Sequence, residues 1–107
     1  MLASASNTSS TLVNADRQNN IIRERVANYC KFMGDVFHTV ALLRDQGMDP
    51  SAVLAGMMAS ELPDDVKSEA INIITLVYSV PELSPDEIGF AIFGQCVEQM
   101  TGIRRQA

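Results

Sequence analysis

Cys30 and Cys96 carry the most reactive side chains of this 107-residue sequence, and they are its only two cysteines. They stand 66 positions apart, a spacing that suits neither a Cys-x-x-Cys redox motif nor a zinc knuckle. Together with the single histidine, His38, they also fall short of the four ligands of a structural zinc site. Two interpretations remain open at this point: two buried free thiols, or one disulfide.

Carboxylates form the second group of residues with chemical potential. Glu61, Asp64 and Asp65 stand close together in the sequence, and Asp86 and Glu87 are adjacent. Paired carboxylates can transfer protons or bind calcium. Both groups, however, lie where a helix is predicted to begin, and the dipole of a helix favours negative charge in its first turn. We interpret all five as helix-start residues that are also candidate contacts for a partner protein.

No catalytic or cofactor motif is found elsewhere: no phosphate-binding loop, no Gly-x-Gly-x-x-Gly, no His-Glu-x-x-His and no Gly-x-Ser-x-Gly. His38 follows Phe37 at the edge of an apolar helix face, where a histidine is typically structural or exposed. Met57 and Met58 suit an adaptable binding surface, but filling the core explains them more simply. The sequence therefore predicts a protein that is not an enzyme and uses no cofactor and no metal.

Charge is unevenly distributed along the chain. The net charge is −5, yet residues 45–103 hold ten acidic residues and one basic residue, Lys67. Such a surface repels nucleic acid phosphates and favours a basic protein partner. The alternative interpretation is a solvated surface that keeps a small protein soluble. No apolar run approaches the ~20 residues of a membrane-spanning helix, so we expect no membrane insertion.

Four helices are predicted to position these residues. The apolar spacing indicates helices over 17–46, from Pro50 to a point before Pro63, over 64–79 and over 85–101. The expected fold is all-α, a compact four-helix domain with orthogonal or bundle-like packing. Residues 1–15 are expected to form a flexible tail, residues 16–102 a single helical domain, and residues 103–107 a short basic tail.

The stretch from Val77 to Glu87 predicts a tight corner between the last two helices. Pro81 cannot continue the preceding helix. Ser84 and Glu87 have the spacing of a capping box, with Pro85 at the first helical position. Glycines 34, 56, 89 and 94 fall inside predicted helices, where each costs about 1 kcal/mol relative to alanine. Close helix crossings or an approaching partner would each explain them.

The two cysteines lie on the apolar stripes of the first and last helices, which favours the disulfide. Closing a 66-residue span stabilises a domain by about 4 kcal/mol in the chain-entropy model. A disulfide indicates an oxidising compartment. The stretch Ala3-Ser4-Ala5 also fits the small-x-small pattern of a signal-peptide cleavage site, so a remnant of a removed signal peptide is one interpretation of the N-terminus. We expect a periplasmic protein, with a cytoplasmic protein carrying two free thiols as the alternative.

Taken together, Tyr29-Cys30, the stretch "VYSVPELSPDE" and the late Cys96 resemble small exported helical proteins of proteobacteria, mostly of unknown function. The layout over residues 22–100 is similar to HdeA-like periplasmic acid-stress chaperones and to the helical immunity proteins against type VI secretion amidase effectors. The resemblance implies a non-enzymatic protein of the cell envelope, for which an immunity or inhibitor role is one concrete form. The acidic C-terminal half would bind a basic protein partner. An acid-activated chaperone, a cytosolic interaction module and a homodimer remain as further hypotheses.

Overall fold

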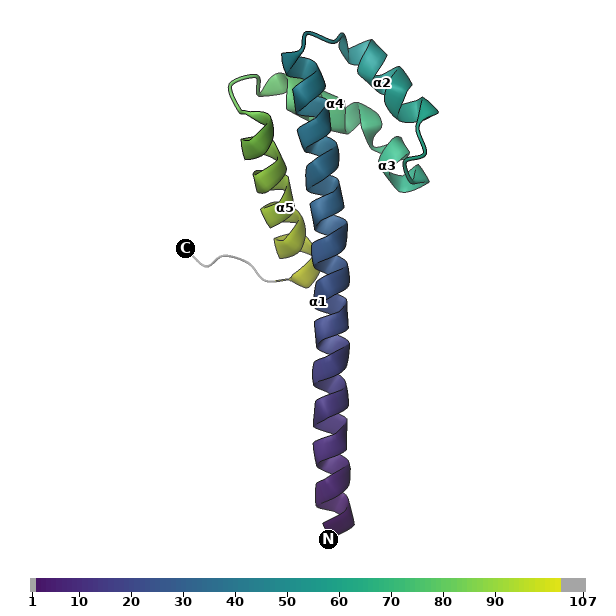
Figure 1. Cartoon of the computed structure of the whole chain (residues 1–107), viewed down its shortest axis with the longest axis vertical. Coiled ribbons are helices and arrows are strands. Elements are labelled where there is room, and N and C mark those ends of the chain that lie inside the picture. The colour runs from purple at the N-terminus through teal and green to yellow at the C-terminus, as the bar shows by residue number, and fades with distance from the viewer. Residues whose placement is uncertain (1, 103–107) are drawn as a thin grey trace.

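The structure, a computed structural model, describes the backbone of residues 2–102 and the side chains of residues 18–102. Over that part of the chain it is entirely helical, which confirms the predicted fold class. A long helix runs through the molecule, and four shorter helices gather around its C-terminal half (Figure 1). In chain order they are α1 (Leu2–Asp45), α2 (Pro50–Ala59), α3 (Asp64–Ser68), α4 (Ala70–Ser79) and α5 (Pro85–Thr101).

The first helix begins at Leu2 and not near residue 17 as predicted. The physical reason is that no proline or glycine interrupts the chain before Gly34, so nothing stops the helical backbone from continuing towards the N-terminus. The side chains of residues 1–17 and all of residues 103–107 lie outside the described part of the chain, so the flexible and basic tails stay predictions.

The predicted third helix is two helices, which makes the described part of the chain a five-helix fold. Glu69 separates α3 from α4, and its N–H bonds to the Val66 carbonyl in a tighter turn than an α-helix uses. Ser68 helps to end α3, because its hydroxyl donates to the Asp65 carbonyl at 2.7 Å. The break lets α3 turn away from the axis of α4.

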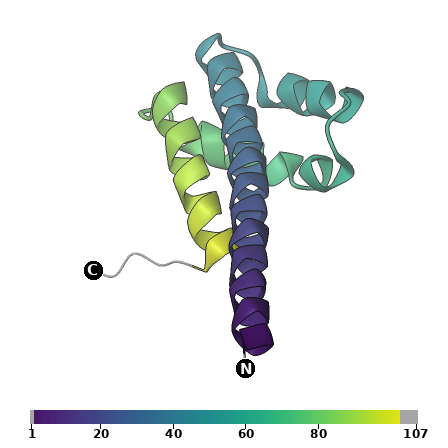
Figure 2. The same cartoon turned by 60° about the horizontal axis from the view of Figure 1, so that its bottom comes forward.

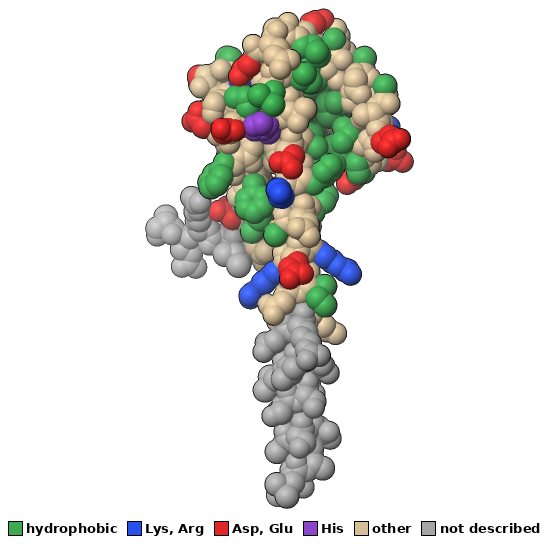
Figure 3. Space-filling view, in the orientation of Figure 1, with side chains coloured by type: hydrophobic (Ala, Val, Ile, Leu, Met, Phe, Trp, Pro, Cys, Tyr) green, Lys and Arg blue, Asp and Glu red, His purple; other side chains and the backbone are tan. Residues whose placement is uncertain are grey.

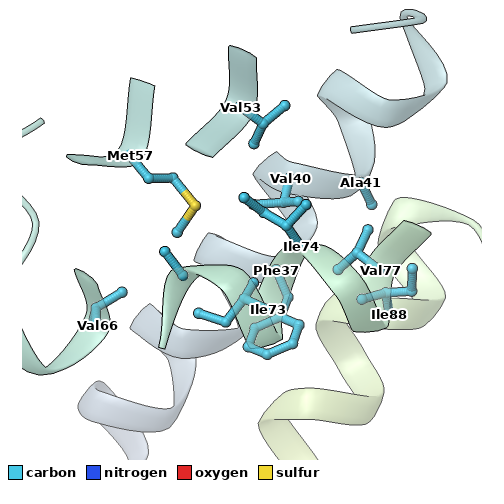
Figure 4. Close-up of a cluster of buried hydrophobic side chains, with 11 residues drawn as sticks. Phe37, Val40, Ala41, Val53, Met57, Val66, Ile73, Ile74, Val77 and Ile88 are labelled. Atoms are coloured by element: carbon cyan, nitrogen blue, oxygen red, sulfur yellow. The ribbon is translucent and has the colours of Figure 1, made fainter. Parts of the chain in front are cut away.

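The core fills the space between α1 and the shorter helices (Figure 4). Helix α4 crosses α1 steeply, while α5 runs alongside α1 in two views (Figures 1 and 2). All the core side chains are apolar, and no side-chain nitrogen or oxygen buried among the described residues lacks a hydrogen-bond partner. The cluster consists of Phe37, Val40, Ala41, Val53, Met57, Val66, Ala70, Ile73, Ile74, Val77 and Ile88.

The C-terminal end of α1 is closed as the sequence predicts. Gly47 has a φ of 82°, the left-handed conformation that glycine adopts without strain. Its N–H bonds to the Arg44 carbonyl at 2.9 Å, and the N–H of Met48 bonds to the Leu43 carbonyl at 3.0 Å. This pair of bonds is a Schellman motif, which satisfies carbonyls that the helix end would otherwise leave free.

The corner between α4 and α5 is held by Arg44 of α1. Its guanidinium donates to the carbonyls of Val77 at 2.9 Å, Val80 at 3.1 Å and Leu83 at 2.7 Å. The predicted capping box is also present: Glu87 N–H donates to Ser84 Oγ, and Ser84 N–H donates to Glu87 Oε1, both at 3.1 Å. The corner thereby fixes where α5 starts and which of its side chains face outward.

Candidate functional site

The predicted disulfide is confirmed and joins α1 to α5. Cys30 and Cys96 are bonded, with their Cα atoms 5.4 Å apart. Cys30 is fully buried, and Met100 lies over the bridge with its sulfur 3.9 Å from each cysteine sulfur. The bridge is a structural cross-link between the first and last helices, and it holds α5 against the middle of α1.

The five predicted carboxylates form two separate groups. Glu61 lies in the connection between α2 and α3, and Asp64 and Asp65 form the first turn of α3. Asp86 and Glu87 stand in the first turn of α5, on another part of the head, by which we mean helices α2 to α5 with the half of α1 that they surround. The structure therefore does not bring all five together. Acidic side chains are spread around the upper part of the molecule (Figure 3).

Phe90 marks the more unusual of these two regions. Its side chain is 81% exposed, the highest value of any large apolar residue in the described part of the chain. Asp86 and Glu87 precede it by four and three positions on α5, so both carboxylates share its helix face. The exposed ring and the two carboxylates together make this helix face a candidate contact surface.

A hollow of about 430 Å³ lies beside Phe90, between α1 and α5. His38 Nε2 donates to Asp86 Oδ1 at 3.0 Å across this hollow, which ties the start of α5 to α1. The Asp86 side chain is nonetheless 94% exposed. The lining residues are Lys31, Gly34, Asp35, His38, Asp86, Gly89, Phe90 and Phe93.

The two glycines that line this hollow allow a close approach of helices α1 and α5. A Cβ at Gly34 would lie 2.8 Å from the carbonyl oxygen of Gly89, and a Cβ at Gly89 would lie 3.2 Å from that of Gly34. Helices α1 and α5 therefore cross backbone against backbone at this point. Gly56 and Gly94 have no such neighbour, since a Cβ at either would meet nothing within 4 Å.

A larger groove of about 690 Å³ separates α1 from α2. Its lining is apolar apart from Asp35, Thr39 and Ser60, and Gly56 on α2 leaves it open. Hydrophobic side chains gather on this side of the head (Figure 3). The α1 wall consists of Phe32, Asp35, Val36, Thr39, Val40 and Leu43, and the other wall of Met48, Ala52, Val53, Gly56, Met57, Ser60 and Leu62.

A third hollow, of about 570 Å³, lies under the disulfide between α1, α4 and α5. Tyr29, Leu76 and Met100 line it and are each at least 40% exposed. Asp65 reaches its rim and is the only member of the predicted carboxylate set that does so. The hollow adjoins the structural cross-link, since Cys96 is one of its lining residues.

Within the described residues, no three or more histidine, cysteine, aspartate or glutamate side chains gather where they could hold a metal ion. In the same part of the chain, no helix combines the length and the apolar character needed to cross a membrane. The features that sequence reasoning missed are Phe90 and the groove. Phe90 stands two positions after Ile88 and so falls off the apolar stripe of α5, a signal that the sequence already contained.

Comparisons of this chain with protein-family models, with curated proteins and with solved structures found no match.

Proposed function

We propose that this protein is a non-enzymatic binding protein of the periplasm that holds a basic protein partner at the surface around Phe90. The observation that carries the proposal is the 81% exposed Phe90 ring with two carboxylates on the same helix face. Aromatic side chains that stand exposed on a folded surface are typical anchors of protein interfaces.

The charges around Phe90 suit an arginine of the partner. A guanidinium can stack on the face of an aromatic ring and bond to a neighbouring carboxylate. Asp86 uses Oδ1 for His38, and Glu87 uses Oε1 for Ser84, so each carboxylate keeps a second oxygen for a partner. The electrostatic potential of the whole region is also negative, like that of these two carboxylates, because residues 32–102 hold eleven acidic and two basic residues.

The disulfide supports the proposed location in the periplasm. Cys30 and Cys96 form a cross-link that reducing cytosol does not normally maintain, whereas the periplasm does. An immunity or inhibitor protein is one concrete form of the proposed function, in which the acidic surface covers a basic region of an effector. Thiol titration of the chain unfolded without reductant tests the premise: free thiols in protein taken from cells would overturn the periplasmic assignment.

The binding surface is tested with a short arginine peptide, titrated against the labelled full chain by NMR. We expect amide shifts to concentrate at residues 86–93 and to disappear at high salt, because the contact is largely electrostatic. A glutamate peptide of equal length is the control ligand. A pull-down from envelope extract then uses the wild type, Phe90→Ala and Ile71→Ala as baits.

Ile71→Ala is the matched control, because Ile71 is 65% exposed and lies on α4, outside the Phe90 surface. A true partner is retained by the wild type and by Ile71→Ala but lost by Phe90→Ala and at high salt. The proposal is wrong if Phe90→Ala retains the same proteins as Ile71→Ala and the arginine peptide shifts no resonance near α5.

A further inference from the structure

We infer that the groove between α1 and α2 receives helix α1 of a second copy of this chain, so that two copies pair through antiparallel α1 helices. The inference concerns a different surface from the one around Phe90. It starts from the part of α1 that the head leaves uncovered: residues 18–25, here called the stalk, are all exposed, and Val26 is the first buried residue (Figures 1 and 3). An uncovered helical segment gains no stability from packing in the monomer.

Helix α1 carries two seams with coiled-coil spacing, one apolar and one largely apolar. The core seam faces α4 and α5 and consists of Val26, Cys30, Met33, Phe37 and Val40, at alternating steps of four and three. A second set repeats this spacing one position earlier, which places it about 100° around the helix. This outer seam consists of Ile22, Arg25, Tyr29, Phe32, Val36, Thr39 and Leu43.

The outer seam runs from the stalk into the groove. Its first part is exposed, with Ile22 58% and Tyr29 40% exposed. Its second part, from Phe32 to Leu43, lies on the α1 wall of the groove. From Ile22 to Leu43 the seam is about 32 Å long at 1.5 Å per residue. In an antiparallel pair centred on Phe32, the stalk half of one copy therefore lies in the groove half of the other.

The order of side chains along the outer seam suits this pairing. Polar residues occur only at Arg25 and Thr39, and antiparallel pairing about Phe32 places these two positions opposite each other. At all the remaining positions of the seam an apolar residue meets an apolar residue: Ile22 faces Leu43, and Tyr29 faces Val36. A parallel pair would instead place Arg25 against Arg25 of the second copy, and like charges in a seam are destabilising.

The residues that lie beside the outer seam also pair apolar with apolar and polar with polar in the antiparallel register. Ile21 and Leu42 each stand one position before a seam end, and they are 49% and 41% exposed. The antiparallel register places them next to each other, and it places Asn28 next to Asp35. The pairing thus involves every large apolar side chain of α1 that is exposed in the described part of the chain, namely Ile21, Ile22, Tyr29 and Leu42.

Charge favours the same arrangement. Residues 18–31 hold three basic residues and one acidic residue, whereas residues 32–102 hold eleven acidic and two basic residues. Antiparallel pairing lays the basic segment of each copy along the acidic head of the other. The contact is the same on both copies, so it closes as a two-fold dimer in which both grooves are filled and no further copy can add.

Sedimentation equilibrium of the full chain, from micromolar to submillimolar concentration, tests the pairing. We expect a monomer–dimer equilibrium that Ile22→Asp weakens about 30-fold or more, the effect of losing a buried interface anchor. Ile71→Asp is the matched control, because Ile71 is similarly exposed, at 65% against 58% for Ile22, and lies outside the seam; it should leave the equilibrium unchanged. Gly56→Leu should block the groove with the same loss, whereas Gly94→Leu, also in open space, should not.

Mixing experiments determine the direction of the helices. Ile21→Glu and Leu42→Lys should each dimerise poorly alone but form a mixed dimer when combined, because only the antiparallel register brings Glu and Lys together. A mixture of Ile21→Glu and Ile21→Lys would form the mixed dimer only in a parallel pair. The inference is overturned if the wild type stays monomeric throughout, if Ile22→Asp and Ile71→Asp behave alike, or if only the second mixture pairs. Circular dichroism of each variant checks that α1 remains helical. Phe90→Ala should leave dimerisation unaffected, so that the dimer is tested independently of the proposed partner surface.

Discussion

Arg44 should be the most costly charged residue of the chain to replace. Its side chain is only 6% exposed, and its guanidinium bonds three carbonyls at the corner between α4 and α5. Arg44→Met keeps the aliphatic stem but removes all three donors. The carbonyls of Val77, Val80 and Leu83 then lose the one side chain that donates to all three.

The magnitude follows from those three bonds. A hydrogen bond to a charged group contributes roughly 1.5 kcal/mol or more, and part of each loss is recovered where water reaches the carbonyl. We therefore expect Arg44→Met to lower the free energy of unfolding by about 3–5 kcal/mol, a large share of the 5–15 kcal/mol typical of a domain. Arg44→Lys should fall between, because an ammonium keeps the charge but not the planar fork of donors.

Urea unfolding with the disulfide intact measures this loss. The control is Arg23→Met, an exposed arginine on the same helix, which should change the free energy of unfolding by no more than about 0.5 kcal/mol. Equal unfolding midpoints for Arg44→Met and Arg23→Met would refute the reasoning, since they would mean that the corner does not depend on the guanidinium.

Three further perturbations test the fold. Replacing both Cys30 and Cys96 with serine should lower the free energy of unfolding by about 4 kcal/mol, and a reducing agent should lower that of the wild type equally while leaving the variant unchanged. Gly34→Ala should lower the free energy of unfolding by about 1–3 kcal/mol, because its Cβ would lie 2.8 Å from the Gly89 carbonyl oxygen. Gly94→Ala, in open space, should raise the free energy of unfolding by up to about 1 kcal/mol. Changes of the same sign in the two variants would contradict the close crossing of α1 and α5. Burial, followed by the charge of Asp49, raises the pKa of Tyr78, while Arg44 lowers it, and its hydroxyl donates to the Met48 carbonyl at 2.7 Å. The folded state thus holds this proton more tightly than the unfolded state, so stability should fall as pH rises from about 10 through the raised pKa, and Tyr78→Phe should flatten that fall in pH-dependent urea unfolding.

The sequence by itself determined the local elements of this protein. Pro50, Gly47 and the Ser84–Glu87 capping box each act within one helical turn, so the ends of α2, α1 and α5 could be predicted from neighbouring residues. The apolar stripes also placed Cys30 and Cys96 on facing surfaces of the first and last helices. The break at Glu69 was missed, because the apolar spacing continues through it and only the turn geometry reveals it.

Tertiary structure alone decided the surfaces. Spacing could not distinguish the glycines at the backbone crossing, Gly34 and Gly89, from Gly56 and Gly94, because the difference is the distance to another helix. The purpose of Arg44 was equally hidden, since its three acceptors lie more than 30 positions along the chain. Whether an apolar side chain is core or surface depends on which helix arrives beside it. The sequence places Phe90 off the apolar stripe of α5, but its 81% exposure and the uncovered outer seam of α1 follow only from where the other helices pack.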